Sequence, residues 1–402
     1  MRILFHGPGT SSYLPEIRLP STSGLGHPAT ENLIGLRATH NLTSNRGNLI
    51  HGEAPSRILE CDRRRSAFAN LGALHRQFGD RIGEVLSQRF DLLVLSAANF
   101  ISVTKELIRL RDALNAIGDS VPFIVLGAGL QGQPELSQMH PSVQEVLDIY
   151  NRRALIFAVR GYETEAWLHK NGFANARALG CPSMFVFPSS IMSLSHKTLV
   201  MKGEQADVMT AGYLTVKGGR NYNRGVKLAK ALKDMRSSYV FQDEFFAYEG
   251  LLKKKGSFND ATCRADRDLL NEFLSRETGV SVNMQNYYYF SETSAWRQAA
   301  LAHDVYIGDR FHGGIAALQA GRPGIFLCHD NRVAEMTDFY SLPRLTTDEL
   351  LSEGVVNVIA SRLNADTIKR LKETYLKRLV DFKNVMSKHN LRVLVPTPDL
   401  KI

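Results

Sequence analysis

A short segment near residue 310 combines residue types that can bind an anion and transfer a proton. It runs from Asp309 to Gly314 and reads Asp-Arg-Phe-His-Gly-Gly. A strand predicted over Val305–Ile307 leads into it, and its glycines open a predicted helix whose first N–H groups can seat a phosphate or carboxylate. Arg310 offers planar paired donors, and His312 is titratable, with neighbours that favour a functional over a structural role. Asp309 is either a helix cap or the partner that orients Arg310 or His312.

A second arginine occupies the corresponding place in the first half of the chain. Arg160 ends a predicted strand over Ala154–Val159 and precedes a predicted helix over Glu163–Asn171. In open α/β sheets, ligands bind at this edge, and the N-terminus of the following helix favours anions. The alternative is a surface ion pair with Glu163 or Glu165. Two arginines at strand ends of facing domains predict a small, multiply charged anion in the cleft between them.

Three other motifs are interpreted as structural. The glycines of Gly127–Gly132 match GxGxxG, but Pro134 and polar residues follow where a helix should open, so a tight turn is favoured over a dinucleotide site. Cys181 has no base nearby in sequence and is interpreted as a buried structural thiol. Asp243 and Glu244 could do acid–base work or bind a sugar, but we interpret them as an acidic loop tip flanked by core aromatic residues. The four cysteines are widely spaced without a CxxC pair, so no metal site is predicted.

The elements that position these residues form an α/β pattern. Asp91–Ser96 and Pro122–Leu126 are near-continuous apolar runs, typical of buried parallel strands, and helices alternate with them. A break at Phe187–Ser195 precedes a second set of strands and helices, which includes a predicted helix over Arg264–Arg276 and a predicted strand over Gly324–Leu327. Apolar residues from Ile368 to Met386 have the spacing of one long amphipathic helix. We expect a domain over residues 1–190, a second over 191–365, and a basic helix with its tail over 366–402.

Composition narrows the class of protein. The 402 residues are 44% hydrophobic and 22% charged, which is typical of a soluble globular protein. No apolar stretch approaches the roughly 18 residues of a membrane span, and the N-terminus does not resemble a signal peptide. The net charge is +9, but residues 361–402 alone hold ten Lys/Arg against four Asp/Glu, and no nucleic-acid motif accompanies them. We therefore expect a cytoplasmic protein that does not bind nucleic acid, with the basic helix available to an anionic membrane surface.

Two blocks, Ala158–Phe185 and Ala302–Met336, resemble the polysaccharide pyruvyl transferases. The resemblance lies in an Arg-Gly turn leading to Gly-Cys-Pro, and in a later Arg-x-His followed by a small-residue helix and a Gly-x-Pro turn. It implies two Rossmann-like domains facing a cleft, in an arrangement similar to GT-B glycosyltransferases. It also implies transfer of the pyruvyl group of phosphoenolpyruvate onto two sugar hydroxyls as a cyclic ketal.

The resemblance assigns roles to particular residues on the donor side. Arg160 and Arg310 would bind the phosphate and carboxylate of phosphoenolpyruvate. His312 would stand beside the reacting carbon and act as the catalytic residue. The backbone N–H of Phe311 and the helix start at Gly313 would complete the anion seat. The N-terminal domain would then serve the acceptor and the C-terminal domain the donor.

On the acceptor side the sequence departs from the family pattern. The N-terminal loop of the family carries a compact Gly/Asn/Asp motif, for which Thr30–Gly35 is the possible counterpart here, with Asn32 as an acceptor-binding residue. Ser96–Asn99 replaces the polyglycine that usually follows the second strand.

The predicted function is thus a ketal pyruvyl transferase for a sugar of a surface polysaccharide or its precursor. No metal or organic cofactor is expected, since phosphoenolpyruvate is the donor substrate. One alternative is a GT-B glycosyltransferase, which would need a carboxylate to clamp a nucleotide ribose, with Asp330 and Glu335 as candidates. Another is a non-catalytic carbohydrate- or anion-binding relative, against which the Arg310 and His312 pair argues.

Overall fold

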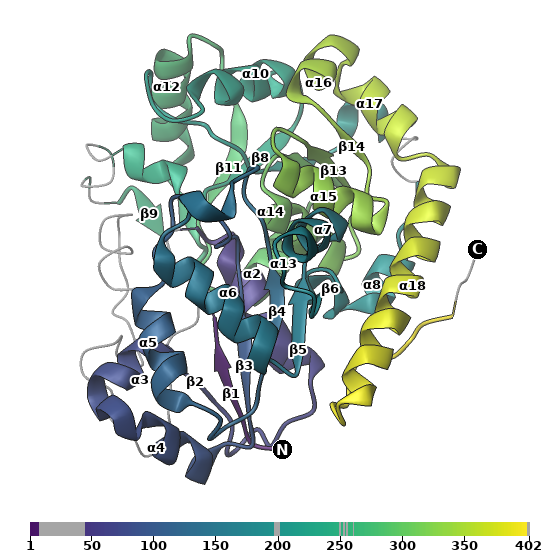
Figure 1. Cartoon of the computed structure of the whole chain (residues 1–402). Coiled ribbons are helices and arrows are strands. Elements are labelled where there is room, and N and C mark those ends of the chain that lie inside the picture. The colour runs from purple at the N-terminus through teal and green to yellow at the C-terminus, as the bar shows by residue number, and fades with distance from the viewer. Residues whose placement is uncertain are drawn as a thin grey trace.

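Two β-sheets organise the chain in this computed structural model, which describes residues 1–7, 45–196, 202–248, 251, 254, 256–259 and 261–399 (Figure 1). The first sheet is parallel throughout, with the strand order β2-β1-β3-β4-β5-β6. Its strands are β1 (Ile3–His6), β2 (Ala67–Phe68), β3 (Leu92–Ser96), β4 (Phe123–Ala128), β5 (Ile156–Val159) and β6 (Ala176–Ala178). Both apolar runs that predicted buried parallel strands are therefore confirmed as β3 and β4.

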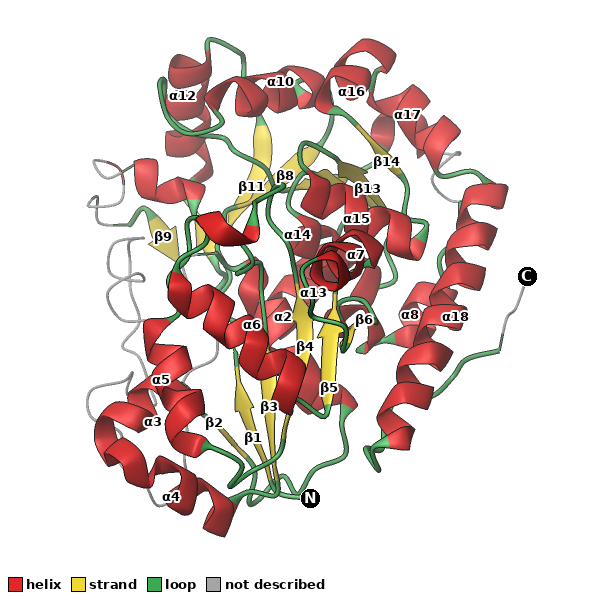
Figure 2. Ribbon diagram, viewed as in Figure 1, coloured by secondary structure: helices red, strands yellow, loops and turns green. Residues whose placement is uncertain are grey.

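Helices cover both faces of this sheet (Figure 2). Successive side chains of β3 alternate between two cores: Leu93 and Leu95 pack on the side of helices α3 to α6, whereas Leu92 and Val94 belong to the core that contains α2. A strand buried on both faces needs apolar residues at every position, which explains the near-continuous run. These helices are α2 (Gly47–Ile58), α3 (Leu71–Phe78), α4 (Ile82–Arg89), α5 (Ile108–Ile117), α6 (Pro141–Arg153) and α7 (Tyr162–Lys170).

The second sheet has the order β14-β13-β12-β7-β8-β11-β10-β9 and is parallel from β14 to β11. The last pairs, through β10, are antiparallel. Its strands are β7 (Val208–Thr210), β8 (Ser237–Val240), β9 (Phe258–Asn259), β10 (Arg264–Ala265), β11 (Met284–Tyr288), β12 (Val305–Gly308), β13 (Gly324–Leu327) and β14 (Arg344–Leu345). The first sheet ends at Ala178 and the second begins at Val208, on either side of the predicted domain boundary at residue 190.

Two elements of the second half differ from prediction. The helix expected from Arg264 begins instead at Arg267, because the Asp266 side chain accepts a hydrogen bond from the Leu269 N–H and caps it there. Strand β11 was not predicted, since Gln285 and Asn286 interrupt its apolar run. The helices of this half are α8 (Pro188–Met192), α10 (Tyr222–Leu232), α12 (Arg267–Thr278), α13 (Thr293–Leu301), α14 (Phe311–Gln319), α15 (Asn331–Tyr340), α16 (Thr347–Glu353) and α17 (Val355–Arg362).

A long C-terminal helix, α18 (Ala365–Lys388), runs along one edge of the molecule (Figure 1). Its predicted apolar face is buried, and the Tyr375 hydroxyl donates a hydrogen bond to the Met184 carbonyl at 3.1 Å. The chain then returns to the first half, where the Glu60 N–H bonds to the Arg392 carbonyl. Within the described residues, no helix is long and apolar enough to cross a membrane.

One apolar cluster connects the two halves. Residues of α2, of the 3-10 turn Pro182–Phe185 and of α14 all belong to it, and α2 packs directly against α14. Helix α2 therefore carries its own N-terminus to the boundary between the sheets. The predicted fold class is confirmed: two Rossmann-like α/β layers in a GT-B-like arrangement, followed by a long C-terminal helix.

Candidate active site

A cleft lies where the strand ends of the two sheets face each other. Arg160 follows β5 of the first sheet, and Phe311 begins α14 directly after β12 of the second. The cleft has a volume of about 570 Å³, counting the part open to solvent, and Arg160, Arg310, Phe311 and His312 all line it. The structure thus brings together four of the six predicted site residues. Gly313 is buried against Tyr306 instead, and Asn32 lies outside the described residues.

Arg160 is a buried arginine held by neutral partners. Its guanidinium donates from Nε to the Gly127 carbonyl at 2.8 Å and from Nη1 to Asn99 Oδ1, and the residue is 5% exposed. Among the described residues it forms no ion pair, so the alternative pairing with Glu163 or Glu165 is not found there. A buried charge without a counterion is costly, so an anion that entered the cleft could pair favourably with Arg160.

The glycine-rich segment after β4 positions Arg160. Gly127 supplies the carbonyl acceptor and adopts φ = 76°, which suits glycine. At Gly129, an added Cβ would come within 2.6 Å of Asn99 Oδ1 and 2.9 Å of Arg160 Cδ. No α-helix opens at Gly132, in agreement with a turn rather than a dinucleotide-binding motif. These glycines make room for the arginine.

Arg310, by contrast, is already neutralised by carboxylates. Its Nη2 contacts Asp243, and lies 2.8 Å from Glu244 Oε2, while its guanidinium stacks 3.8 Å from the ring centre of Tyr213. Burial lowers the pKa of Arg310, but Glu244 and Asp243 outweigh it and raise that pKa above its ordinary value. The interpretation of Asp243 and Glu244 as a loop tip is therefore wrong: Glu244 is buried and serves as a counterion.

Asp309 has neither of its predicted roles. It is buried and ion-pairs with Arg224, whose Nε lies 2.7 Å from Asp309 Oδ2. Helix α14 begins at Phe311 with Arg310 as its N-cap residue and no side-chain cap. The helix therefore starts before Gly313, and the first N–H groups, which have no intrahelical partner, belong to Phe311 and His312. Donors for the predicted anion seat would therefore come from these two cleft-lining residues and not from Gly313.

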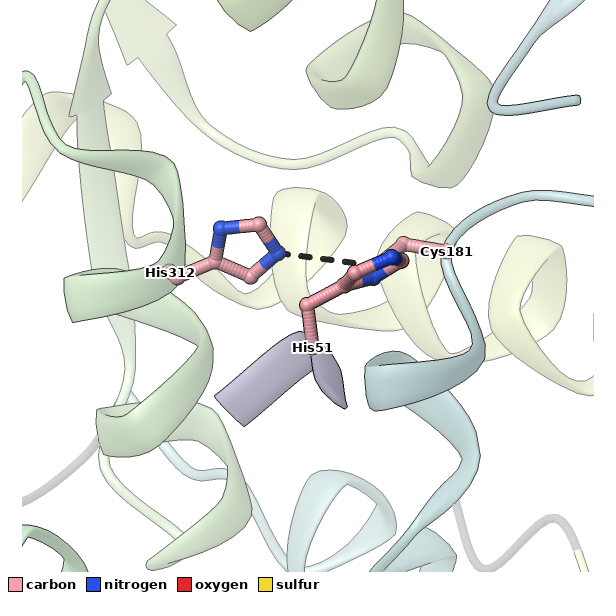
Figure 3. Close-up of side chains that lie close together, drawn as sticks. All are labelled: His51, Cys181 and His312. Carbon is pink, nitrogen blue, oxygen red and sulfur yellow. Dashed lines mark hydrogen bonds between the residues drawn. The ribbon is translucent and has the colours of Figure 1, made fainter. Parts of the chain in front are cut away.

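His312 lies between cationic groups and a thiol. Burial lowers its pKa well below the ordinary value, and Arg160, His51 and Arg332 lower it further. The lowered pKa favours the neutral imidazole. Its Nε2 lies 3.6 Å from Cys181 Sγ (Figure 3). An anion bound between these arginines would offset their positive field and favour the protonated imidazole.

Cys181 is buried, as predicted, but it does have bases beside it. His51 Nδ1 lies 3.2 Å from its sulfur, and the His51 and His312 rings are 5.7 Å apart. Burial raises the pKa of the Cys181 thiol, while Arg160 and the neighbouring Ser183 oppose the rise. Sequence reasoning did not place a base beside Cys181 because both histidines are at least 130 positions away along the chain.

A side chain from the second half of the chain caps the N-terminus of α7. Glu335 of α15 accepts hydrogen bonds from the Thr164 N–H at 2.6 Å and from its hydroxyl at 2.9 Å. Gly161 permits this approach, since an added Cβ would meet Glu335 Cγ at 2.5 Å. This helix end therefore does not offer the ligand seat that the sequence predicted. Asp330 is also engaged, by Arg332 at 2.6 Å, so both carboxylates considered as ribose clamps already have partners.

The segment at the start of α2 was missed as a functional candidate. Asn45 and Asn48 line the cleft together with Gln242. The Gly47 N–H donates to Gln242 Oε1 at 3.3 Å, and an added Cβ at Gly47 would come within 3.0 Å of His312 Cβ. The Asn-Arg-Gly-Asn sequence of residues 45–48, which spans the start of α2, was the available signal. It has the composition that was sought at Thr30–Gly35, which lies outside the described residues.

Comparison with known proteins gives a family and a set of fold relatives. The model of the family described as polysaccharide pyruvyl transferase matches residues 45–331, more than half of this chain. No curated protein matches. Among solved structures, HepE of Anabaena in complex with UDP and glucose is 11% identical over 97% of this chain and 99% of its own, with a TM-score of 0.48. A putative UDP-N-acetylglucosamine 2-epimerase from Listeria monocytogenes is 11% identical over 83% of each chain, with a TM-score of 0.46.

Proposed function

Because the chain belongs to the polysaccharide pyruvyl transferase family, we propose that it transfers the pyruvyl group of phosphoenolpyruvate onto two hydroxyls of a sugar. The product is a cyclic ketal on a surface polysaccharide or its precursor. The observation that carries this proposal is the buried Arg160 guanidinium, which lines the cleft beside His312 without an ion-pair partner among the described residues.

The charge of phosphoenolpyruvate fits this environment. It carries a carboxylate and a phosphate, and Arg160 and Arg332 both line the cleft. Arg310 contributes through its free edge: its hydrogen bonds in the described part of the chain involve Nε and Nη2, which leaves Nη1 for a ligand. The N–H groups of Phe311 and His312 add donors at a helix N-terminus. The ion pairs with Asp243 and Glu244 fix the position of the Arg310 guanidinium when the ligand binds.

The proposed reaction needs one proton transferred to carbon. Protonation of the phosphoenolpyruvate methylene carbon creates a cationic centre at carbon 2, and a sugar hydroxyl attacks it. The carbon–oxygen bond to phosphate then breaks, and a second hydroxyl closes the ketal. One hydroxyl proton balances the new methyl group and the other leaves with phosphate. His312, protonated once the anion is bound, is the proposed acid, and Arg160 and the helix start stabilise the departing phosphate.

The acceptor would enter beside the start of α2. Asn45, Asn48 and Gln242 are neutral side chains with both donors and acceptors, which suit sugar hydroxyls. They line the same cleft as His312, but they have no positive charge with which to bind the anionic phosphoenolpyruvate. We therefore propose that they bind the acceptor, whereas the prediction for Asn32 concerns a residue outside the described ones.

A ligand screen by thermal unfolding tests the proposal without knowledge of the acceptor. Phosphoenolpyruvate should raise the melting temperature by binding the folded state. Inorganic phosphate and UDP-glucose at equal concentration should raise it much less. Stabilisation by UDP-glucose alone would overturn the pyruvyl transferase in favour of the glycosyltransferase. Phosphoenolpyruvate binding without phosphate release across a panel of sugar acceptors would favour the non-catalytic anion-binding relative.

A further inference from the structure

Three potential metal ligands converge behind the cleft. They are His51 of α2, Cys181 in the turn after β6, and His312 of α14 (Figure 3). One ligand atom of each lies within 4.8 Å of the others. His51 and Cys181 are fully buried, whereas His312 reaches the cleft. The proposed reaction uses only His312, so it leaves the convergence of the other two side chains unexplained.

We propose that His51, Cys181 and His312 form a binding site for a thiophilic divalent cation, with Zn²⁺ as the probe. Two imidazoles and one thiolate are ligands that Zn²⁺ favours, at about 2.0–2.1 Å for nitrogen and about 2.3 Å for sulfur in tetrahedral geometry. The sulfur lies 3.2 Å from His51 Nδ1 and 3.6 Å from His312 Nε2. Both separations suit adjacent corners of such a tetrahedron.

The charges around the cluster define how the ion would bind. Burial lowers the pKa of His51 to about 3, and the pKa of His312 is also lowered, so both imidazoles already have the neutral form that binds metal. The Cys181 thiol must lose its proton to become a ligand, and one H⁺ is therefore released for each Zn²⁺ bound. Ser183 Oγ, 3.0 Å from the sulfur, can donate to the thiolate. Arg160 and Arg332 oppose a cation, so binding depends on the thiolate.

Metal binding would inhibit the proposed reaction. A nitrogen that coordinates a metal ion has no lone pair for a proton, so occupied His312 could no longer take up the proton that it is proposed to deliver. This consequence for turnover rests on the proposed function, whereas binding of the ion does not. The site would therefore make the enzyme sensitive to free Zn²⁺, with the ion held at the floor of the cleft.

Metal-free protein titrated with Co²⁺ and Zn²⁺ tests the site directly. We expect one Co²⁺ per chain with a thiolate-to-cobalt charge-transfer band and the visible bands of tetrahedral Co²⁺. Zn²⁺ should displace the bound Co²⁺. In a separate titration of metal-free protein, binding of Zn²⁺ should release one proton per ion. Cys181→Ser should abolish the charge-transfer band and weaken Zn²⁺ binding by at least about 100-fold, the upper end of the cost of losing a ligand-supporting contact. Cys328→Ser is the matched control, because this thiol contacts Thr337 away from the cluster, and it should bind like the wild type.

Either of two results would overturn the site. One is wild-type protein that binds no stoichiometric Co²⁺ or shows no thiolate band, a result that does not depend on the folding of any variant. The other is folded Cys181→Ser protein that binds as tightly as wild type. The three side chains would then be a hydrogen-bonded network only. Phosphoenolpyruvate binding is measured separately without metal, so failure of the metal site and failure of the proposed function give different outcomes.

Discussion

Glu335 on α15 caps helix α7 of the opposite half through Thr164, whose N–H and hydroxyl both donate to its carboxylate. The contact bridges 171 positions of sequence. Burial raises the pKa of Glu335 above its ordinary value of 4.5, although the hydrogen bonds from Thr164 oppose the rise. The two halves are therefore joined through a carboxyl group that burial makes harder to ionise.

This contact predicts a pH-dependent stability. A carboxyl group whose pKa is higher in the folded state binds protons more tightly there, so the free energy of unfolding falls as pH rises from 4.5 through the folded-state pKa. Glu335→Gln cannot ionise and should lose this contribution. Relative to wild type, the variant should become progressively more stable as pH increases across that window, as measured by urea unfolding at each pH. A difference between the two proteins that stays constant with pH would contradict the prediction.

Substitution of Arg310 should lower the free energy of unfolding much more than substitution of Arg160. Arg310→Gln leaves Glu244 buried without its cation, and breaking a buried pair in this way costs about 3–5 kcal/mol. Arg160→Gln loses hydrogen bonds to Gly127 and Asn99 but also removes an unpaired buried charge. It should cost less than about 1.5 kcal/mol, the upper value for one neutral hydrogen bond. Urea unfolding without ligand measures both, and equal losses would mean that Arg160 has a counterion.

The charge-conserving variant Arg160→Lys separates geometry from charge in ligand binding. Lysine keeps the positive charge but cannot reach Gly127 and Asn99 while presenting a planar fork. We expect phosphoenolpyruvate affinity to fall at least about tenfold, corresponding to about 1.4 kcal/mol, in isothermal titration calorimetry. Arg322→Lys is the control, since this arginine bonds to the Leu301 carbonyl away from the cleft. Normal binding by Arg160→Lys would remove Arg160 from the donor site.

His312→Ala tests whether this residue acts in chemistry rather than binding. General acid–base help is typically worth about 10²–10⁴-fold in rate, so kcat should fall within that range. Phosphoenolpyruvate affinity should change much less, because Arg160, Arg332 and helix N–H groups remain. Phosphate release with an active acceptor gives kcat, and calorimetry without acceptor gives affinity. A loss of affinity with kcat preserved at saturation would make His312 a binding residue.

Asn48→Ala probes the proposed acceptor side. Loss of its amide removes two N–H donors and one carbonyl acceptor from the cleft wall at the start of α2. We expect KM for the sugar acceptor to rise several-fold, consistent with about 0.5–1.5 kcal/mol for a hydrogen bond, while phosphoenolpyruvate affinity stays near that of the wild type. Asn45→Ala is an informative companion, since Asn45 also bonds to the Gly47 N–H. An unchanged acceptor KM in both variants would place the acceptor elsewhere.

The sequence by itself determined the elements and the edge at which the site forms. Apolar runs predicted β3, β4, β5, β12 and β13, and the spacing from Ile368 to Met386 predicted α18, because these patterns reflect burial along a single element. Arg160, Arg310 and His312 could be placed near one another because polar residues after parallel strands gather at one sheet edge. These predictions do not depend on which side chains are in contact.

Only the tertiary structure decided which charges are already satisfied. Arg160 and Arg310 occupy equivalent sequence contexts, yet Glu244, 66 positions away, neutralises Arg310, while within the described part of the chain Arg160 has only neutral hydrogen-bond acceptors. The same holds for His51 beside Cys181, 130 positions apart. Whether a charged group is free to bind a ligand depends on the partners that packing brings within a few ångströms, and such partners leave no periodic signal in the chain. The residue types of the site could therefore be predicted from the sequence. Which of the two arginines is already paired with a carboxylate was decided by the fold.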